Sequence, residues 1–134
     1  MFLATPQATA KTILIVEDVD LNFLLLQKII ERTAHFQYTI IRAKNGKIAV
    51  DYCSECGEPD LIFMDIEMPI MNGIQATEHI KRRFPEIPVV IQTAYTSEEN
   101  REKAQKAGSN DFITKPIRKE HIASILSKFI PVVS

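Results

Sequence analysis

Net charge, long apolar runs and cysteine are all scarce in this sequence. Lys and Arg number 16 against 17 Asp and Glu, for a net charge of -1, which creates no field that attracts nucleic acid or an anionic membrane. The longest aliphatic runs, Ile13–Val16 and Phe23–Leu26, are far shorter than the roughly 18–20 residues that span a bilayer. The first residues lack the cationic start and apolar length of a signal peptide. We therefore expect a cytoplasmic protein that binds neither nucleic acid nor membranes.

The only cysteines, Cys53 and Cys56, are too few for a disulfide framework but have C-x-x-C spacing. Reactive pairs of this kind usually begin a helix, where the helix dipole favours the thiolate. This pair instead precedes Gly57, which is typical of a helix C-terminus. No nearby His or further Cys completes a zinc site. We expect ordinary reduced thiols.

A chain of 134 residues fits one domain, and its 46% apolar content suffices for a core without metal or disulfide. We expect the domain to occupy residues 11–130. Residues 1–10 are then a loose N-terminal tail and residues 131–134 a short C-terminal one.

Five short apolar runs alternate with amphipathic segments along this domain. The expected strands are Ile13–Val16, Tyr38–Arg42, Leu61–Met64, Val89–Gln92 and Asp111–Ile113. The expected helices are Asp20–Thr33, Gly46–Glu55, a third from Asn72 to the residue before Pro85, a fourth from Thr96 to the residue before Gly108, and Arg118–Phe129. Five βα units with short connections predict an α/β fold, (βα)5, in which a doubly wound parallel sheet has helices on both faces. The expected strand order is the flavodoxin-like 2-1-3-4-5.

The fourth helix differs from the others in its start and in its anchoring. Thr96 and Glu99 have the spacing of a capping box. The inner face offers only Ala104 and Ala107 as apolar residues, so we expect this helix to be held weakly compared with helices anchored by Ile and Phe. Weakly held elements are the ones that a ligand can shift.

Acidic residues follow two of the expected strands. Glu17 and Asp18 come directly after the first strand, and Asp65 after the third. Ligands of such sheets bind beyond the carboxyl ends of the strands, where these carboxylates converge and would repel one another. Oxygen ligands without His or Cys suit Mg2+ (or Mn2+). Alternatively, Asp18 or Asp20 simply caps the first helix.

A hydroxyl and an ammonium face these carboxylates from the ends of the fourth and fifth strands, at Thr93 and Lys115. Carboxylates can act as nucleophiles toward phosphoryl groups. A metal and a lysine would neutralise a phosphoryl group on such a carboxylate, and the hydroxyl could donate a hydrogen bond to one of its oxygens.

The sequence resembles a known family, the response-regulator receiver domains (CheY-like) of two-component signalling. The matching segments are Ile13–Asp18, Pro59–Gly73, Gln92–Ala94 and Gly108–Pro116. They occur in family order within roughly residues 11 to 130.

The resemblance implies that Asp65 accepts phosphate from a histidine kinase or a histidine phosphotransfer domain. It implies that Mg2+ is held by Glu17, Asp18, Asp65 and the backbone carbonyl of Glu67. Such a protein is not an enzyme in the ordinary sense, although it assists its own phosphorylation and dephosphorylation.

The resemblance also implies a phosphoryl-binding set and a switch. Thr93, Ala94 and Lys115 would bind the phosphoryl oxygens, and the peptide bond before Pro116 would be cis. Thr93 and Phe112 would form the switch: as Thr93 moves to the phosphoryl group, the Phe112 ring turns into the space that it leaves. A downstream protein would contact the face made by the fourth helix, the fifth strand and the fifth helix.

Two other functions suit the same fold. A flavodoxin-type cofactor-binding protein needs an anion-friendly loop after the first strand, whereas Glu17–Asn22 is acidic. A small phosphohydrolase would use Asp65 as nucleophile and Glu67 as general acid, but such enzymes usually need a cap that this length does not provide. Within the receiver interpretation, the chain is either a stand-alone receiver or a piece of a longer hybrid kinase, and we expect no output domain after residue 134.

Overall fold

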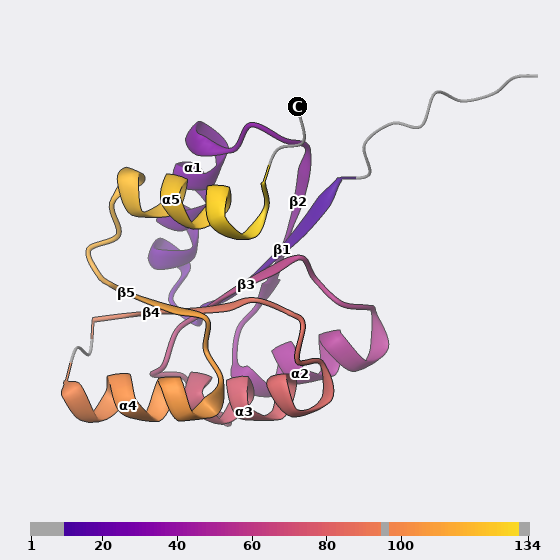
Figure 1. The fold of residues 1–134 in the computed structure, drawn as a ribbon, viewed down its shortest axis with the longest axis vertical. Coiled ribbons are helices and arrows are strands. Elements are labelled where there is room, and N and C mark those ends of the chain that lie inside the picture. Colours follow the sequence, from indigo (N-terminus) through magenta and orange to yellow (C-terminus); the bar gives the residue numbers. More distant parts are fainter. Residues whose placement is uncertain (1–9, 95–96, 132–134) are drawn as a thin grey trace, which may run out of the picture.

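The computed structural model describes residues 10–94 and 97–131, and within them strands and helices alternate (Figure 1). The strands are β1 (Lys11–Val16), β2 (Tyr38–Ala43), β3 (Leu61–Met64), β4 (Val89–Thr93) and β5 (Asp111–Thr114). The helices are α1 (Asp20–Thr33), α2 (Gly46–Glu55), α3 (Gly73–Arg83), α4 (Glu98–Ala107) and α5 (Lys119–Phe129). This is the predicted succession of βα units.

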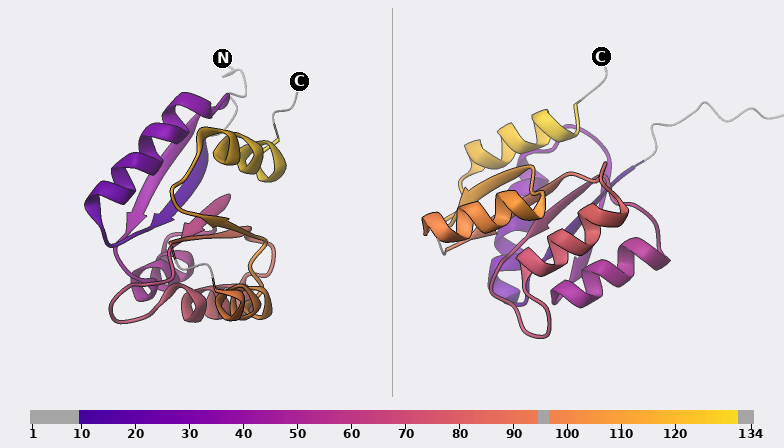
Figure 2. Two further views of the ribbon diagram at one scale, coloured as in Figure 1. Left: turned by 90° about the vertical axis from the view of Figure 1, so that its left-hand side faces the viewer. Right: turned by 60° about the horizontal axis from the view of Figure 1, so that its bottom comes forward.

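The strands form one parallel sheet in the order β2-β1-β3-β4-β5, which confirms the predicted topology. Helices α1 and α5 cover one face, and α2, α3 and α4 lie side by side on the other (Figure 1, Figure 2). Strands covered on both faces are apolar along their length. Accordingly, every residue of β3 and β4 is buried.

The side chains of each strand alternate between two core layers. Ile15, Phe63 and Ile113 belong to the layer beneath α1 and α5. Val16 and Met64 belong to the layer beneath α2, α3 and α4. This alternation fixes the face of each polar residue that follows a strand.

The observed strands are slightly longer than predicted. Strands β4 and β5 each run one residue further, because Thr93 pairs with Thr114. Strand β1 begins two residues earlier, where Lys11 pairs with Tyr38, and β2 extends to Ala43. The ladder depends on backbone pairing, which polar residues join as readily as apolar ones, so the apolar pattern marked only its central part.

The cap of α4 differs from the predicted one, and the alternative in which Asp18 or Asp20 caps α1 is not observed. Helix α4 is capped by Ser97, whose side chain accepts a hydrogen bond from the backbone N–H of Asn100; Thr96 lies outside the described residues. Helix α1 has Val19 at its N-cap, without a side-chain hydrogen bond. Asp20 instead pairs with Arg42 at 2.8 Å, and Asp18 joins a cluster of carboxylates.

The cysteines lie where the sequence predicted. Cys56 is the C-cap of α2, and Gly57 follows it with a φ of 116°, the left-handed conformation that favours glycine. Both cysteines are free. Burial raises the pKa of the Cys53 thiol to about 11, so that thiol stays protonated.

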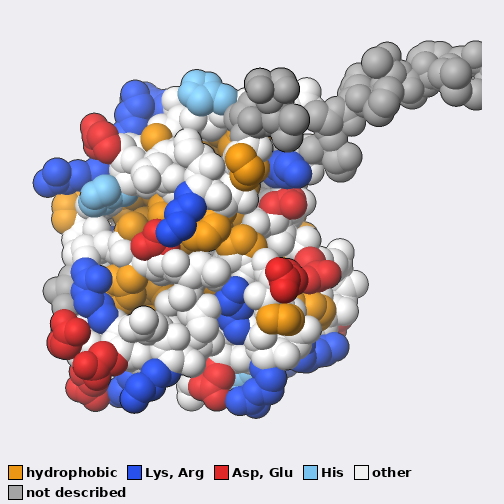
Figure 3. All heavy atoms as spheres, in the orientation of Figure 1, with side chains coloured by type: hydrophobic (Ala, Val, Ile, Leu, Met, Phe, Trp, Pro, Cys, Tyr) orange, Lys and Arg blue, Asp and Glu red, His pale blue; other side chains and the backbone are white. Residues whose placement is uncertain are grey.

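The surface agrees with the near-zero net charge. On the face seen in Figure 3, basic and acidic side chains intermingle without a large area of one sign. Within the described ranges, no helix has the length and apolar character needed to cross a membrane.

Candidate metal and phosphoryl site

Three carboxylates meet at the carboxyl edge of the sheet. The backbone N–H of Glu17 donates to Ala43 at 3.0 Å and that of Asp65 donates to Val16 at 3.0 Å, so both ladders continue one residue beyond their strands. This pairing brings Glu17, Asp18 and Asp65 together, with one carboxylate oxygen of each within 4.8 Å of the others. The predicted convergence is therefore present.

Burial makes this cluster electrostatically unfavourable by itself. Glu17 is 0% exposed and Asp65 is 6% exposed. Burial and the neighbouring Glu17 carboxylate raise the pKa of Asp65 to about 7, although the Lys115 ammonium acts in the opposite direction. A cation would restore the ionised form of Asp65.

The donor set fits a hard divalent cation. The Oδ1 atom of Asp18 is buried and has no hydrogen-bond partner in the described part of the chain, and buried polar atoms rarely remain unsatisfied. All three side chains offer oxygen, which is the ligand that Mg2+ prefers. The cluster can therefore hold a divalent metal.

Lys115 reaches the cluster from the edge strand β5. Its ammonium lies 2.8 Å from Glu17 Oε1 and 3.3 Å from Asp65 Oδ2, and its backbone N–H donates to the Thr93 carbonyl at 2.8 Å. The Lys115–Pro116 peptide bond is cis, as the resemblance implies. One lysine thus contacts two of the three carboxylates.

The other predicted site residues lie around this centre. Thr93 is buried at the end of β4, and Ala94 after it is exposed. Glu67 is exposed in the loop two residues after Asp65. Phe112 is half-buried on β5, with the Arg101 guanidinium of α4 4.6 Å from its ring centre.

Two residues that position the carboxylates were not predicted from the sequence. Arg42 donates from Nε and Nη2 to the Glu17 carbonyl at 3.1 and 3.0 Å, which fixes the backbone just before Asp18. Gly73 packs so closely that an added Cβ would overlap the carbonyl oxygen of Asp65. Arg42 could have been recognised as a single basic residue within the apolar strand β2. Gly73 could have been recognised from the Asn-Gly pair at the start of α3.

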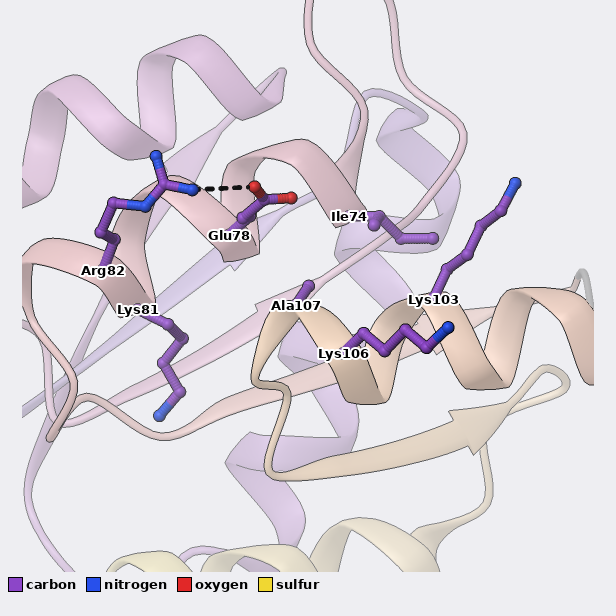
Figure 4. A pocket seen from close by; sticks show the side chains of 7 residues that line it. All are labelled: Ile74, Glu78, Lys81, Arg82, Lys103, Lys106 and Ala107. Carbon is purple, nitrogen blue, oxygen red and sulfur yellow. Dashed lines mark hydrogen bonds and ion pairs between the residues drawn. The ribbon is translucent and has the colours of Figure 1, made fainter.

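A separate hollow lies away from the carboxylate cluster. It is a groove of about 660 Å³ between α3 and α4 (Figure 4). Arg82 pairs with Glu78 at 3.0 Å, Lys103 pairs with Glu99 at 3.0 Å, and Lys81 donates to the Ile87 carbonyl at 2.7 Å. Most of the basic side chains that line this groove therefore already have a partner. The groove is lined by none of the three carboxylates of the cluster, so we do not assign the metal and phosphoryl site there.

The parallel sheet and its acidic edge place the chain among doubly wound α/β proteins that can bind a divalent metal at the strand ends. Within that class, the chain belongs to the response regulator receiver domains, whose family model matches residues 13–127.

Similar proteins cover most of the chain. It is 38% identical over 119 residues to the chemotaxis protein CheY of Halobacterium salinarum, covering 88% of this chain and 95% of the relative. It is 40% identical over 118 residues to two-component response regulator 24 of Arabidopsis thaliana, covering 87% and 82%. A solved receiver domain of a Pseudomonas aeruginosa sensor histidine kinase, with magnesium coordinated in its active-site cleft, has a TM-score of 0.81 and 26% identity, covering 92% and 100%.

The chain is thus a phosphoacceptor domain of two-component signalling. Members of this family generally signal rather than catalyse, and they interact with histidine kinases or phosphotransfer proteins and with downstream effectors. The flavodoxin-type and phosphohydrolase alternatives are not favoured.

Proposed function

We propose that Asp65 is the carboxylate that receives the phosphoryl group. One observation carries this choice: Asp65 Oδ1 accepts the Ile66 N–H at 2.8 Å while Oδ2 lies 3.3 Å from the Lys115 ammonium. Donors already surround the oxygens on which the group would arrive. Glu17, by contrast, is completely buried, and its Oε1 is already paired with the Lys115 ammonium at 2.8 Å.

The transfer forms one bond and breaks another. A carboxylate oxygen of Asp65 attacks the phosphorus of a phosphohistidine, and the P–N bond breaks. Its electron pair stays on the imidazole nitrogen, which takes a proton from water. Lys115, Thr93 and the backbone of Ala94 bind the phosphoryl oxygens of the resulting acyl phosphate, and hydrolysis later returns the carboxylate.

The metal ligands in this proposal are Glu17, Asp18, Asp65 and the backbone carbonyl of Glu67. When bound, Mg2+ (or Mn2+) supplies positive charge that offsets the carboxylates and the phosphoryl oxygens. The unsatisfied Oδ1 of Asp18 and the raised pKa of Asp65 support this assignment.

The test is phosphorylation by acetyl phosphate, followed by intact mass. We expect one phosphate on the wild type with Mg2+, none after the metal is chelated, and none on Asp65→Asn. Equal labelling of Asp65→Asn would overturn the choice of residue. Asp60→Asn is a matched control outside the cluster, because the Asp60 carboxylate accepts the Thr12 N–H, and it should be labelled like the wild type.

The face that meets the phosphodonor protein is, in this proposal, the exposed side of α1. Leu21, Leu24 and Leu25 are 65%, 52% and 54% exposed, directly after the acidic loop. Leu25 also lines a hollow of about 210 Å³ with Lys115 and Pro116. Exposed apolar side chains beside a reactive site are typical of a protein contact.

If α1 is the docking face, a change there should slow phosphoryl transfer from a protein donor but not from a small-molecule donor. We expect Leu25→Glu to slow transfer from a histidine phosphotransfer protein by about tenfold or more, since a buried interface charge costs more than about 1.4 kcal/mol. The same variant should accept phosphate from acetyl phosphate at the wild-type rate. Ile48→Glu is the control, because Ile48 is a comparably exposed apolar residue on α2. Equal loss with both donors would contradict the α1 face.

The remaining parts of the proposal concern the downstream partner, the cellular location and the bounds of the domain. The downstream protein contacts the face formed by α4, β5 and α5. The net charge of -1, together with the intermingled charges on the face seen in Figure 3, argues against DNA binding by this chain alone. The free thiols fit the reducing cytoplasm. Residues 11–130 form the receiver domain, whether it acts alone or within a longer hybrid kinase.

A further inference from the structure

A buried amide on β4 has no role in the proposal above. Gln92 is 0% exposed, and neither its Oε1 nor its Nε2 has a hydrogen-bond partner in the described part of the chain. A buried amide without a partner is unfavourable, and native folds contain few of them.

The register places Gln92 beneath α1 and α5. Gln92 lies directly opposite Ile113 of β5 and two residues after Val90. Both of these apolar residues belong to the core layer under α1 and α5, and side chains two apart on a strand share a face. The Gln92 side chain therefore points into that layer, near the carboxyl ends of the strands.

The two buried carboxylates of the site share this face. Glu17 follows Ile15 by two residues and Asp65 follows Phe63 by two, and Ile15 and Phe63 belong to the same layer. The ladder continues through both acidic residues. Glu17, Asp65 and Gln92 thus form a row across the adjacent strands β1, β3 and β4.

Lys115 crosses this row. It belongs to the β5 side of the sheet, yet its ammonium lies 3.3 Å from Asp65 Oδ2 on β3 and 2.8 Å from Glu17 Oε1 on β1. The side chain therefore spans β4, the strand of Gln92. An ammonium has three N–H donors, of which the carboxylates take two, while Gln92 Oε1 is an acceptor that lacks a donor.

We propose that Gln92 is a positioning residue for Lys115: once Asp65 carries a phosphoryl group, Gln92 Oε1 accepts a hydrogen bond from the Lys115 ammonium. The inference rests on the proposed function of Asp65. Phosphoryl oxygens on Asp65 attract the ammonium away from Glu17 on β1 toward β3, and this movement brings it closer to β4. Without the phosphoryl group, the buried Glu17 carboxylate holds Lys115 away from the amide.

Gln92→Met tests this pairing, because methionine keeps the shape and removes both polar atoms. Without ligand, we expect the melting temperature to rise by about 3 °C, since an unsatisfied amide is gone. With Mg2+ and beryllium fluoride, a phosphoryl mimic, the further rise should be smaller than that of the wild type by about 3 °C, since the new hydrogen bond cannot form.

Two controls separate the pairing from general stability. Val90→Ala creates a cavity on the same face of the same strand and should lower both melting temperatures while leaving the rise on ligand binding unchanged. Gln105→Met, on the exposed side of α4, should change neither temperature. If Gln92→Met does not fold, Gln92→Leu serves in its place.

Hydrogen exchange of the Lys115 ammonium, followed by NMR, supplies a second readout. Beryllium fluoride should slow this exchange more in the wild type than in Gln92→Met. Equal ligand-induced rises and equal exchange in the two proteins would overturn the role of Gln92 and leave that of Asp65 intact. Absence of any response in the wild type would instead overturn the proposed function.

Discussion

At the residue scale, Asp65 meets two opposing demands. In its proposed role, burial would protect an acyl phosphate from water, but burial also disfavours the ionised carboxylate that would attack phosphorus. The neighbouring Glu17 makes ionisation harder still, and Lys115 only partly offsets it. This imbalance is the physical reason for the divalent metal in the proposed function.

The same imbalance predicts how the stability of the metal-free protein depends on pH. The pKa of Asp65 is raised from an ordinary value of 3.8 to about 7, so between these values the folded state keeps a proton that the unfolded state has released. The free energy of unfolding should therefore fall as pH rises from about 4 to about 7 and then level off.

Urea unfolding with a chelator present measures this dependence. Asp65→Asn removes the titrating group, so the difference between its profile and that of the wild type isolates Asp65 from the exposed histidines. Mg2+ should abolish the fall, because it stabilises the ionised carboxylate. Parallel profiles of the two proteins would show that Asp65 ionises normally.

At the element scale, α4 is the helix with the least apolar anchoring. Its buried residues are Ala104 and Ala107, as predicted, whereas α5 buries Ile122, Ile125 and Leu126. Burial of one large aliphatic side chain contributes about 1.5–3 kcal/mol, far more than an alanine methyl. Local opening of α4 should therefore require less free energy than opening of α5.

Hydrogen exchange monitored by mass spectrometry tests this order of local stability. Amides of α4 should exchange faster than those of α3 and α5. Ser97→Ala removes the α4 cap and should speed its exchange by about fivefold, because such a cap contributes about 1 kcal/mol. Asn72→Ala removes the corresponding cap of α3 and should leave α4 unchanged. Protection of α4 as strong as that of α5 would contradict the weak anchoring.

The start of α4 could not be predicted to the residue from the sequence pattern. Thr96 and Ser97 are adjacent hydroxyls, and either could have capped a helix with Glu98 and Glu99 in its first turn. Spacing alone does not choose between them. The cap lies at Ser97, and a choice between adjacent hydroxyls depends on tertiary packing.

At the scale of the whole molecule, the sheet was predictable because its strands are covered on both faces. Such strands form continuous apolar runs, and the polar residues at their ends necessarily gather at one edge. The approach of Lys115 to the carboxylates was predicted, but its pairing with Glu17 in particular, 98 positions away, and the isolation of Gln92 were not predictable. Both depend on how side chains cross several strands, which periodicity does not encode.

We propose that a phosphoryl group on Asp65 changes the face formed by α4, β5 and α5. Thr93 ends β4, the strand that leads toward α4 and pairs with β5. Arg101 of α4 lies over the Phe112 ring and 3.5 Å from the Thr114 hydroxyl. Movement of Thr93 toward the phosphoryl group would free space for the ring and disturb these contacts.

Amide NMR of the wild type and Thr93→Ala, with and without Mg2+ and beryllium fluoride, tests this claim most directly. In the wild type, signals of residues 93–120 should move more than those of α1 and α2, apart from the loops that touch the ligand. Thr93→Ala should still be phosphorylated at Asp65 but show smaller shifts in that region. Shifts of wild-type size in Thr93→Ala, or the largest remote shifts in α2, would contradict the claim.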